Sequence, residues 1–218
     1  MSHALHGLFG GTFDPVHNGH LETVLSVVRT CRLEDVCCIP AGTPAHRRRP
    51  QAESVHRHRM LDLAIRDHPQ LYVSDIELRR PAHSYSYDTV SELKATHPER
   101  IFCFILGMDA MAGLESWHRW RELLDSVHFI VMTRPGAAVP TPLPDWWRAA
   151  RAESAEALRR TSAGRIHMAD VAPCLISSSD IRQRLAEKKD ISRLVPAAVS
   201  EYIRNHRLYE HDPSRQPT

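Results

Sequence analysis

The segment Gly10–His20, GGTFDPVHNGH, joins a short apolar run to a longer amphipathic one. The apolar run Leu5–Phe9 predicts a buried strand, and the spacing of apolar residues over Gly19–Cys31 predicts a helix. Two adjacent glycines let the backbone approach a ligand closely, and a helix start presents amides and a positive dipole end to an anion. His17 and His20 are three residues apart, so we expect them on the same side of the first helical turn. The segment therefore predicts a phosphate site between a strand and a helix.

A simpler interpretation of this segment is a plain Gly-Gly turn in which the histidines cap a helix. The chain has 15 histidines, so a pair at this spacing also arises by chance. The strand before the glycines and the helix after them favour the phosphate site. The segment is neither a Walker loop nor the G-x-G-x-x-G fingerprint, which disfavours P-loop ATPases and Rossmann dehydrogenases.

Short apolar runs alternate with longer amphipathic runs along most of the chain. We expect strands at Leu5–Phe9, Val36–Ile39, Leu71–Val73, Ile101–Leu106, Val127–Met132 and Ile166–Met168. We expect helices at Gly19–Cys31, Ser54–Asp67, Ser86–Thr96, Trp117–Leu124 and Trp146–Arg160. This order predicts an α/β fold, a Rossmann-like doubly wound parallel sheet of about six strands with helices on both faces.

The chain becomes helical after the last predicted strand. Helical patterns cover Ser178–Glu187 and Pro196–Asn205, and proline suits a first helical turn. We therefore expect three parts: a Rossmann-like domain over residues 1–175, a C-terminal helical lobe over 176–210, and a disordered tail over 211–218. The proline-rich stretch Pro135–Pro144 indicates a surface loop.

Composition excludes several classes of protein. The chain has 218 residues, of which 42% are hydrophobic, enough for one sizeable core. A formal net charge of +2 makes no case for a nucleic acid or a membrane as partner, and no apolar run approaches the roughly 20 residues of a membrane span. Five cysteines without a C-x-x-C pair indicate reduced thiols rather than a zinc site. With no apolar leader at the N-terminus, we expect a cytoplasmic protein. From the cysteine spacing we also expect no metal ion held by protein side chains.

A second candidate phosphate site is Ile176–Arg182, ISSSDIR, near the other end of the chain. Serines before a helical pattern are good N-caps, and the helix start offers another set of amides. Arg182 follows about one turn into the helix, where its guanidinium can reach the same anion. The simpler alternative is an ordinary capped helix with a solvated arginine.

Both segments resemble signatures of one enzyme family. The first is similar to the H-x-G-H signature of the nucleotidyltransferase superfamily, in the form found in bacterial nicotinate-nucleotide adenylyltransferases. The second resembles the family's I-S-S-[ST]-x-I-R motif, which binds the triphosphate of ATP. The resemblance implies catalytic roles for His17 and His20. It implies an ATP site made of Gly10, Gly11, Thr12, Phe13, His17, His20, Gly107, Asp109, Ile176, Ser177, Ser178 and Arg182.

The same resemblance implies contacts to the second substrate. His46 and Arg47 follow the second predicted strand and match the family's P-P-H-[KR] segment, with Ala45 in place of the usual second proline. Ser86 belongs to a segment similar to S-Y-[TS]-x-D-T and is expected to hold the nicotinate carboxylate at a helix start. Alternative interpretations are a solvated basic loop for the first segment and an ordinary capped helix for the second.

Three further positions complete the expected site. Asp109, in the family's G-x-D after the fourth strand, would bind ribose hydroxyls. Trp117 would stack on the pyridine ring, whereas we expect Trp120 to pack in the core. Arg134, after the fifth strand, would meet the mononucleotide phosphate; a surface arginine in a turn is an equally good interpretation.

The resemblance implies adenylyl transfer from ATP, with Mg²⁺, to nicotinic acid mononucleotide, giving nicotinic acid adenine dinucleotide and pyrophosphate. Related adenylyltransferases that act on nicotinamide mononucleotide or phosphopantetheine are the nearest alternatives. A nucleotide-sensing module without catalysis and a basic RNA-binding domain fit the residues less well. The sequence leaves both a monomer and a homo-oligomer open.

Overall fold

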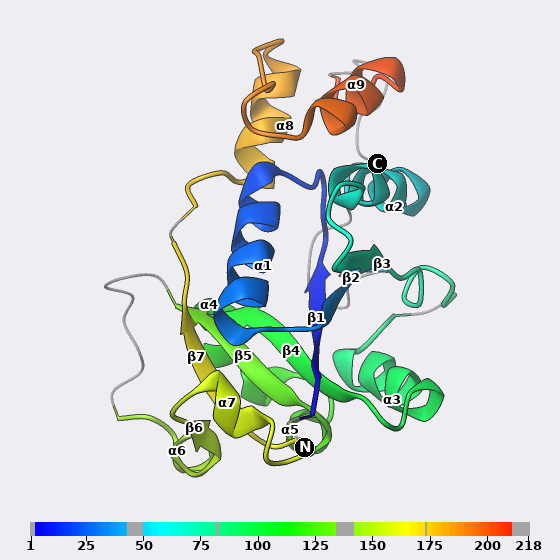
Figure 1. Cartoon of the computed structure of the whole chain (residues 1–218). Coiled ribbons are helices and arrows are strands. Elements are labelled where there is room, and N and C mark those ends of the chain that lie inside the picture. Colours follow the sequence, from blue (N-terminus) through cyan, green and yellow to red (C-terminus); the bar gives the residue numbers. More distant parts are fainter. Residues whose placement is uncertain (1–2, 43–49, 82, 134–141, 173, 211–218) are drawn as a thin grey trace.

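A parallel sheet of seven strands, in the order β3-β2-β1-β4-β5-β7-β6, forms the centre of the molecule (Figure 1). The computed structural model describes residues 3–42, 50–81, 83–133, 142–172 and 174–210. Its strands are β1 Leu5–Gly11, β2 Asp35–Pro40, β3 Leu71–Val73, β4 Ile101–Gly107, β5 His128–Thr133, β6 Arg151–Ala152 and β7 Ile166–Asp170. The chain builds outward from β1 to β3 and then returns to β4, so the strand order reverses between β1 and β4. In such doubly wound sheets, ligands bind at the carboxyl ends of the strands beside this switch point.

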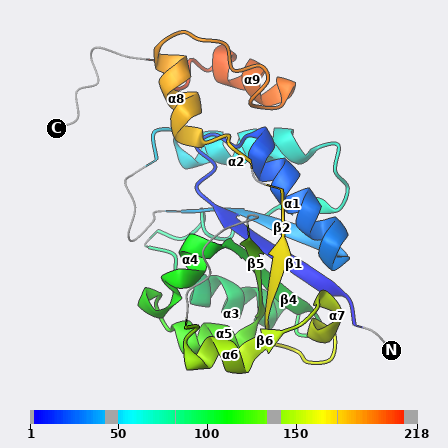
Figure 2. The ribbon, with the colours of Figure 1, turned by 90° about the vertical axis from the view of Figure 1, so that its left-hand side faces the viewer.

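Helices cover both faces of the sheet (Figure 2). They are α1 Asn18–Cys31, α2 Ser54–Ile65, α3 Ser86–Thr96, α4 Met108–Ala112, α5 Trp120–Ser126, α6 Asp145–Ala150, α7 Ala155–Leu158, α8 Ser178–Ala186 and α9 Ala197–Asn205, with a 3₁₀ turn at Leu114–Ser116. Strand β4 shows why two faces exist: Ile101, Cys103 and Ile105 pack with α1 and α2, whereas the alternate residues pack with α3 and α5. The predicted α/β class with a doubly wound parallel sheet is confirmed.

The predicted single helix over Trp146–Arg160 is wrong. Helix α6 ends at Ala150, and β6 then pairs in parallel with β7 and adds a seventh strand to the sheet. The side chain of Ser154 accepts the amide of Ala157 and so starts α7 as a separate helix. The alanine- and arginine-rich composition of this stretch is favourable for a helix, and only the pairing with β7 overrides it.

The predicted helix over Trp117–Leu124 begins later, at Trp120. Leu114–Ser116 form a 3₁₀ turn, and Arg119 has a left-handed backbone with φ 54°. Trp120 is 9% exposed, which confirms its expected place in the core. The short helix α4 directly after β4 was not predicted.

Helices α8 and α9 lie together beyond the carboxyl ends of the strands (Figure 1). Helix α9 packs against α2, and the buried residues of both C-terminal helices belong to the same apolar cluster as α1 and α2. A boundary near residue 175 stays a prediction, and the expected disordered tail 211–218 lies outside the described residues. None of the described helices combines the length and apolar character needed to cross a membrane.

Candidate active site

The turn after β1 is shaped by an aromatic side chain packed over a glycine. Phe13 has a left-handed backbone with φ 50°, and its side chain is only 2% exposed. A Cβ on Gly11 would lie 2.9 Å from the Phe13 ring, so this close approach requires glycine. The Phe13 ring in turn packs edge-on against the His20 ring, with centroids 5.1 Å apart. Phe13 therefore supports the His20 ring from the buried side of the turn.

His17 and His20 cap the start of α1 reciprocally. The Nδ1 atom of His17 accepts the amide of His20, and the Nδ1 atom of His20 accepts the amide of His17, both at 3.3 Å. The two rings are stacked with centroids 3.7 Å apart. The capping role that we treated as the simpler alternative is thus real, and it holds both imidazoles on one side of the helix as the spacing predicted.

This capping pattern decides which ring nitrogen carries the proton. Burial lowers the pKa of His17 from its ordinary 6.5 to about 4. Burial, together with the neighbouring His17, lowers the pKa of His20 to about 3. Both rings are therefore neutral near pH 7, and because each Nδ1 accepts an amide, the proton of each ring is on Nε2. The pair presents two neutral N–H donors.

The amides at the start of α1 are less available than we expected. The Asn18 amide donates to the carbonyl oxygen of Leu194 at 2.9 Å, and the His20 amide is taken by His17. The imidazole Nε2–H groups, rather than a row of free amides, are therefore the main anion donors at this turn.

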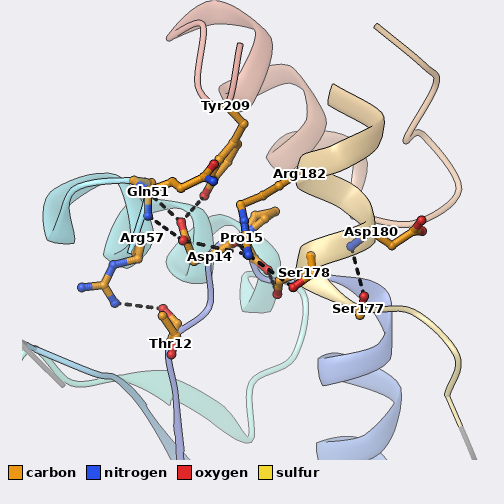
Figure 3. A network of polar contacts seen from close by, with 12 residues as sticks. Thr12, Asp14, Pro15, Gln51, Arg57, Ser177, Ser178, Asp180, Arg182 and Tyr209 are labelled. Atoms are coloured by element: carbon orange, nitrogen blue, oxygen red, sulfur yellow. Dashed lines mark hydrogen bonds and ion pairs between the residues drawn. The ribbon is translucent and has the colours of Figure 1, made fainter. Parts of the chain in front are cut away.

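The start of α8 lies directly against this turn (Figure 3). Ser178 Oγ donates to the carbonyl oxygen of Pro15 at 2.9 Å, and Arg182 Nη1 donates to the carbonyl oxygen of Asp14 at 2.7 Å. Ser177 is the N-cap of α8, as predicted, and accepts the Asp180 amide at 3.1 Å. The two candidate phosphate segments, more than 160 residues apart in the sequence, therefore meet in space.

Three residues that sequence reasoning missed stabilise this junction. The buried Asp14 carboxylate accepts amides from Gln51 and Ala52 and the hydroxyl of Tyr209. Arg57, only 2% exposed, donates to the carbonyl oxygen of Thr12 at 2.8 Å. Asp14 lies within the quoted motif, and a carboxylate buried there would need hydrogen-bond donors, which is a signal for its role. Neither Arg57 nor Tyr209 belongs to a pattern that we recognised in the sequence.

The structure also brings together parts of the expected mononucleotide side. Ser86 is the first residue of α3 and is half-buried. The segment that contains Trp117 lies against this helix start, because His118 packs on Tyr85 and Arg119 lies over the ring of Tyr87. The Trp117 ring is half-buried and packs edge-on against Phe104 of β4.

Asp109 and Gly107 occupy the end of β4, on the other side of the switch point from Gly11. Asp109 is exposed in the first turn of α4, and a Cβ on Gly107 would meet no atom within 4 Å. The space around the Gly107 Cα is therefore open. His46, Arg47 and Arg134 lie outside the described residues, and their predicted contacts stay predictions.

A half-buried carboxylate, that of Glu77, connects the elements around the expected mononucleotide side. Glu77 Oε1 accepts the Thr89 hydroxyl of α3 at 3.0 Å, and Oε2 accepts the amide of Gly42, after β2, at 3.4 Å. Burial raises the pKa of the Glu77 carboxyl above its ordinary value. Glu77 thereby ties the end of β2 to the start of α3, and no motif that we recognised includes it.

These donors suit an elongated anion between two helix starts. Two neutral imidazole donors lie at the start of α1. At the start of α8, the backbone amides of Ser178 and Ser179 have no hydrogen-bond acceptor among the described residues. Within the described ranges, no group of three His, Cys, Asp or Glu side chains is placed to hold a metal ion. The arrangement fits a polyphosphate, whose charge is spread along several oxygens.

Known proteins resemble this chain in sequence and in fold. The cytidylyltransferase-like family matches residues 8–184. A "probable nicotinate-nucleotide adenylyltransferase" of Aeromonas hydrophila subsp. hydrophila is 40% identical over 205 residues, covering 93% of this chain and 96% of that protein. One of Pseudoalteromonas atlantica is 37% identical over 208 residues, covering 94% of each.

A solved structure shares the fold at lower sequence identity. Plasmodium falciparum nicotinic acid mononucleotide adenylyltransferase, complexed with APC, is 21% identical with a TM-score of 0.71, and covers 95% of this chain and 98% of that one. The same enzyme complexed with NaAD gives a TM-score of 0.70 with equal coverage.

The fold, the paired helix starts and these matches define a nucleotidyltransferase of the cytidylyltransferase-like class. Within this class, the chain belongs to the nicotinate-nucleotide adenylyltransferase family.

Proposed function

We propose that this protein transfers the adenylyl group of ATP to nicotinic acid mononucleotide, forming nicotinic acid adenine dinucleotide and pyrophosphate in NAD biosynthesis. The observation that carries the proposal is the junction of two phosphate-binding segments: Arg182 and Ser178 of α8 donate to the backbone of the turn that precedes His17. Relatives that align with nearly the whole chain are named probable nicotinate-nucleotide adenylyltransferases, which supports the same reaction.

The chemistry needs no nucleophilic side chain. A phosphate oxygen of the mononucleotide attacks the α-phosphorus of ATP in line, and the bond from that phosphorus to the α–β bridging oxygen breaks. Pyrophosphate leaves with the electron pair. The protein contributes position and charge stabilisation, as is usual for phosphoryl-group chemistry.

Each donor has a proposed place in this step. The Nε2–H groups of His17 and His20 donate to α- and β-phosphate oxygens, where negative charge builds up as the bond breaks. The start of α8 holds the distal phosphates through the first-turn amides of Ser178 and Ser179 and the hydroxyl of its N-cap, Ser177. Arg182 adds positive charge beside this end while its guanidinium fixes the turn through Asp14.

We propose that Mg²⁺ enters with ATP as part of the substrate. The described residues provide no carboxylate cage for the ion, so phosphate and water oxygens would supply its ligands. The ion would neutralise charge on the triphosphate and the departing pyrophosphate.

The start of α3 is the proposed basis of substrate choice. Amides at a helix start favour the anionic nicotinate carboxylate over the neutral amide of nicotinamide mononucleotide. The neighbouring Trp117 would stack on the pyridine ring, and Asp109 at the end of β4 would bind ribose hydroxyls. His46, Arg47 and Arg134 would contact the mononucleotide phosphate from loops outside the described residues.

The proposal is tested by pyrophosphate release from ATP with three acceptors assayed side by side. We expect efficient pyrophosphate release from ATP when nicotinic acid mononucleotide is the acceptor, weaker release with nicotinamide mononucleotide and none with phosphopantetheine. Preference for either alternative acceptor would reassign the substrate. The cytoplasm stays our prediction for the site of the reaction. All five cysteines are free thiols, and four of them are buried, which supports this prediction.

A further inference from the structure

The carboxylate of Asp14 is shared by parts of the chain that are remote in sequence. Its side chain is 5% exposed. Oδ2 accepts the Gln51 amide at 2.8 Å, while Oδ1 accepts the Ala52 amide at 3.0 Å and the Tyr209 hydroxyl at 2.8 Å. A buried carboxylate held by three donors is fixed in position, because each lost donor leaves an unsatisfied charge. Asp14 is thus tied both to the entry of α2 and to the end of the C-terminal helices.

The backbone around Asp14 is held from the same C-terminal side. Arg182 donates to the carbonyl oxygen of Asp14, and Ser178 donates to that of Pro15 (Figure 3). His17 follows Pro15 by two residues and starts the capping pair. Two C-terminal side chains therefore fix the backbone of the turn from which the two imidazoles project.

Tyr209 reaches this position through an unusual chain path. After α9, the backbone adopts left-handed conformations at Arg207, with φ 50°, and at Tyr209, with φ 65°. Such conformations are unfavourable for bulky residues and persist where surrounding contacts over-determine them. Burial and the adjacent Asp14 raise the pKa of the Tyr209 hydroxyl far above its ordinary range, so it remains a donor.

We propose that Tyr209 is a positioning residue for adenylyl transfer, which acts through Asp14 on the turn that carries His17 and His20. This role rests on the proposed function. Tyr209 touches no substrate; its hydroxyl holds the carboxylate that fixes the turn. The end of the C-terminal helices thereby becomes part of the catalytic apparatus, although it is 195 residues away from Asp14 in sequence.

The expected defect has a specific kinetic form. Without the hydroxyl, Oδ1 of Asp14 keeps only the Ala52 amide, and the turn gains freedom. Donors that act mainly in the transition state lose effect when their position is imprecise, whereas substrate binding draws on many other contacts. The change therefore lowers kcat more than it raises either KM.

The test compares Tyr209→Phe with Tyr202→Phe. Both changes remove one hydroxyl from the C-terminal region, but the hydrogen bond of the Tyr202 hydroxyl is to His56 Nδ1, at 3.0 Å, and not to the turn that carries His17 and His20. We expect Tyr209→Phe to lower kcat about tenfold, the size of one lost hydrogen bond to a charged group, with each KM changed less than about threefold. Tyr202→Phe should keep kcat within about twofold. Both are assayed well below their melting temperatures.

Asp14→Ala extends the test to the coupling itself, because it removes the acceptor of the Tyr209 hydroxyl. If Tyr209 acts through the carboxylate, adding Tyr209→Phe to Asp14→Ala lowers kcat by much less than tenfold. Equal kcat for the two tyrosine variants, or a full additional loss in the Ala background, would overturn the role of Tyr209. Absence of dinucleotide formation by the unmodified protein would instead overturn the proposed function, and this role with it.

Discussion

At the scale of single residues, His17 and His20 combine a structural and a chemical task. Each imidazole accepts a capping hydrogen bond at Nδ1, so its protonated Nε2 is not needed for the cap and can donate to a ligand. A free histidine pair would lose rotamer freedom on binding phosphate, but this pair is already held by stacking at 3.7 Å and by the Phe13 ring. The cap thus prepares the donors before the substrate arrives.

Replacing His20 by alanine removes one such donor. We expect kcat for dinucleotide formation to fall by about 10²–10³-fold, the usual effect of losing one preorganised transition-state donor. His97→Ala is the matched control, because His97 lies at the far end of α3 as its C-cap. Near-normal kcat for His20→Ala would refute the catalytic assignment.

The lowered pKa values predict an unusual titration of the free protein. Near pH 6 both imidazoles should be neutral with the proton on Nε2, and should take up protons only near pH 4 for His17 and lower for His20. Nitrogen-15 NMR of the rings, assigned with His20→Gln, measures this directly. Between about pH 6.5 and 4 the unfolded chain binds these protons and the folded chain does not, so stability falls as pH falls. Protonation of both rings with midpoints near 6.5 would contradict this account of the site.

At the scale of elements, the first turn of α1 and the segment before α8 fit together closely. A Cβ on Gly19 would lie 2.4 Å from Cys174 Sγ and 3.1 Å from His17 Nδ1. Packing therefore requires glycine at this position of the H-x-G-H motif. The Cys174 thiol approaches Gly19 from the segment before α8, and the imidazole of His17 approaches it from the N-cap of α1.

Gly19→Ala should therefore lower kcat by at least about tenfold, because the new methyl group displaces the His17 ring. Cys174→Ala alone should leave kcat within about twofold, and the double variant should recover only part of the loss. Gly113→Ala serves as control, since a Cβ there comes no closer than 3.8 Å to any atom. Full activity of Gly19→Ala would show that the close packing is not required.

At the scale of the whole molecule, six of the seven strands of the described sheet were predictable from local patterns, as were the elements that flank the two candidate phosphate segments. Runs such as Ile101–Leu106 are apolar throughout because helices cover both faces of β4. The region after Trp146 was mispredicted because β6 exists only through its pairing with β7, a contact that local composition does not encode. The Asp14 network was equally hidden, since Tyr209 approaches it only in the folded chain.

The site depends on both ends of the chain. Strand β1 and the turn after it supply the histidines, while α8 and the residues after α9 fix that turn from the other side (Figure 3). A polyphosphate held between the two helix starts is thus the central claim, and the donors at each end are separated by most of the sequence.

A crystal structure of the protein with a non-hydrolysable ATP analogue tests this claim most directly. We predict α- and β-phosphate oxygens within hydrogen-bond distance of Nε2 of His17 and His20, and the distal phosphate at the first-turn amides of α8. A triphosphate bound away from either helix start, with the imidazole Nε2 atoms turned from it, would contradict the account.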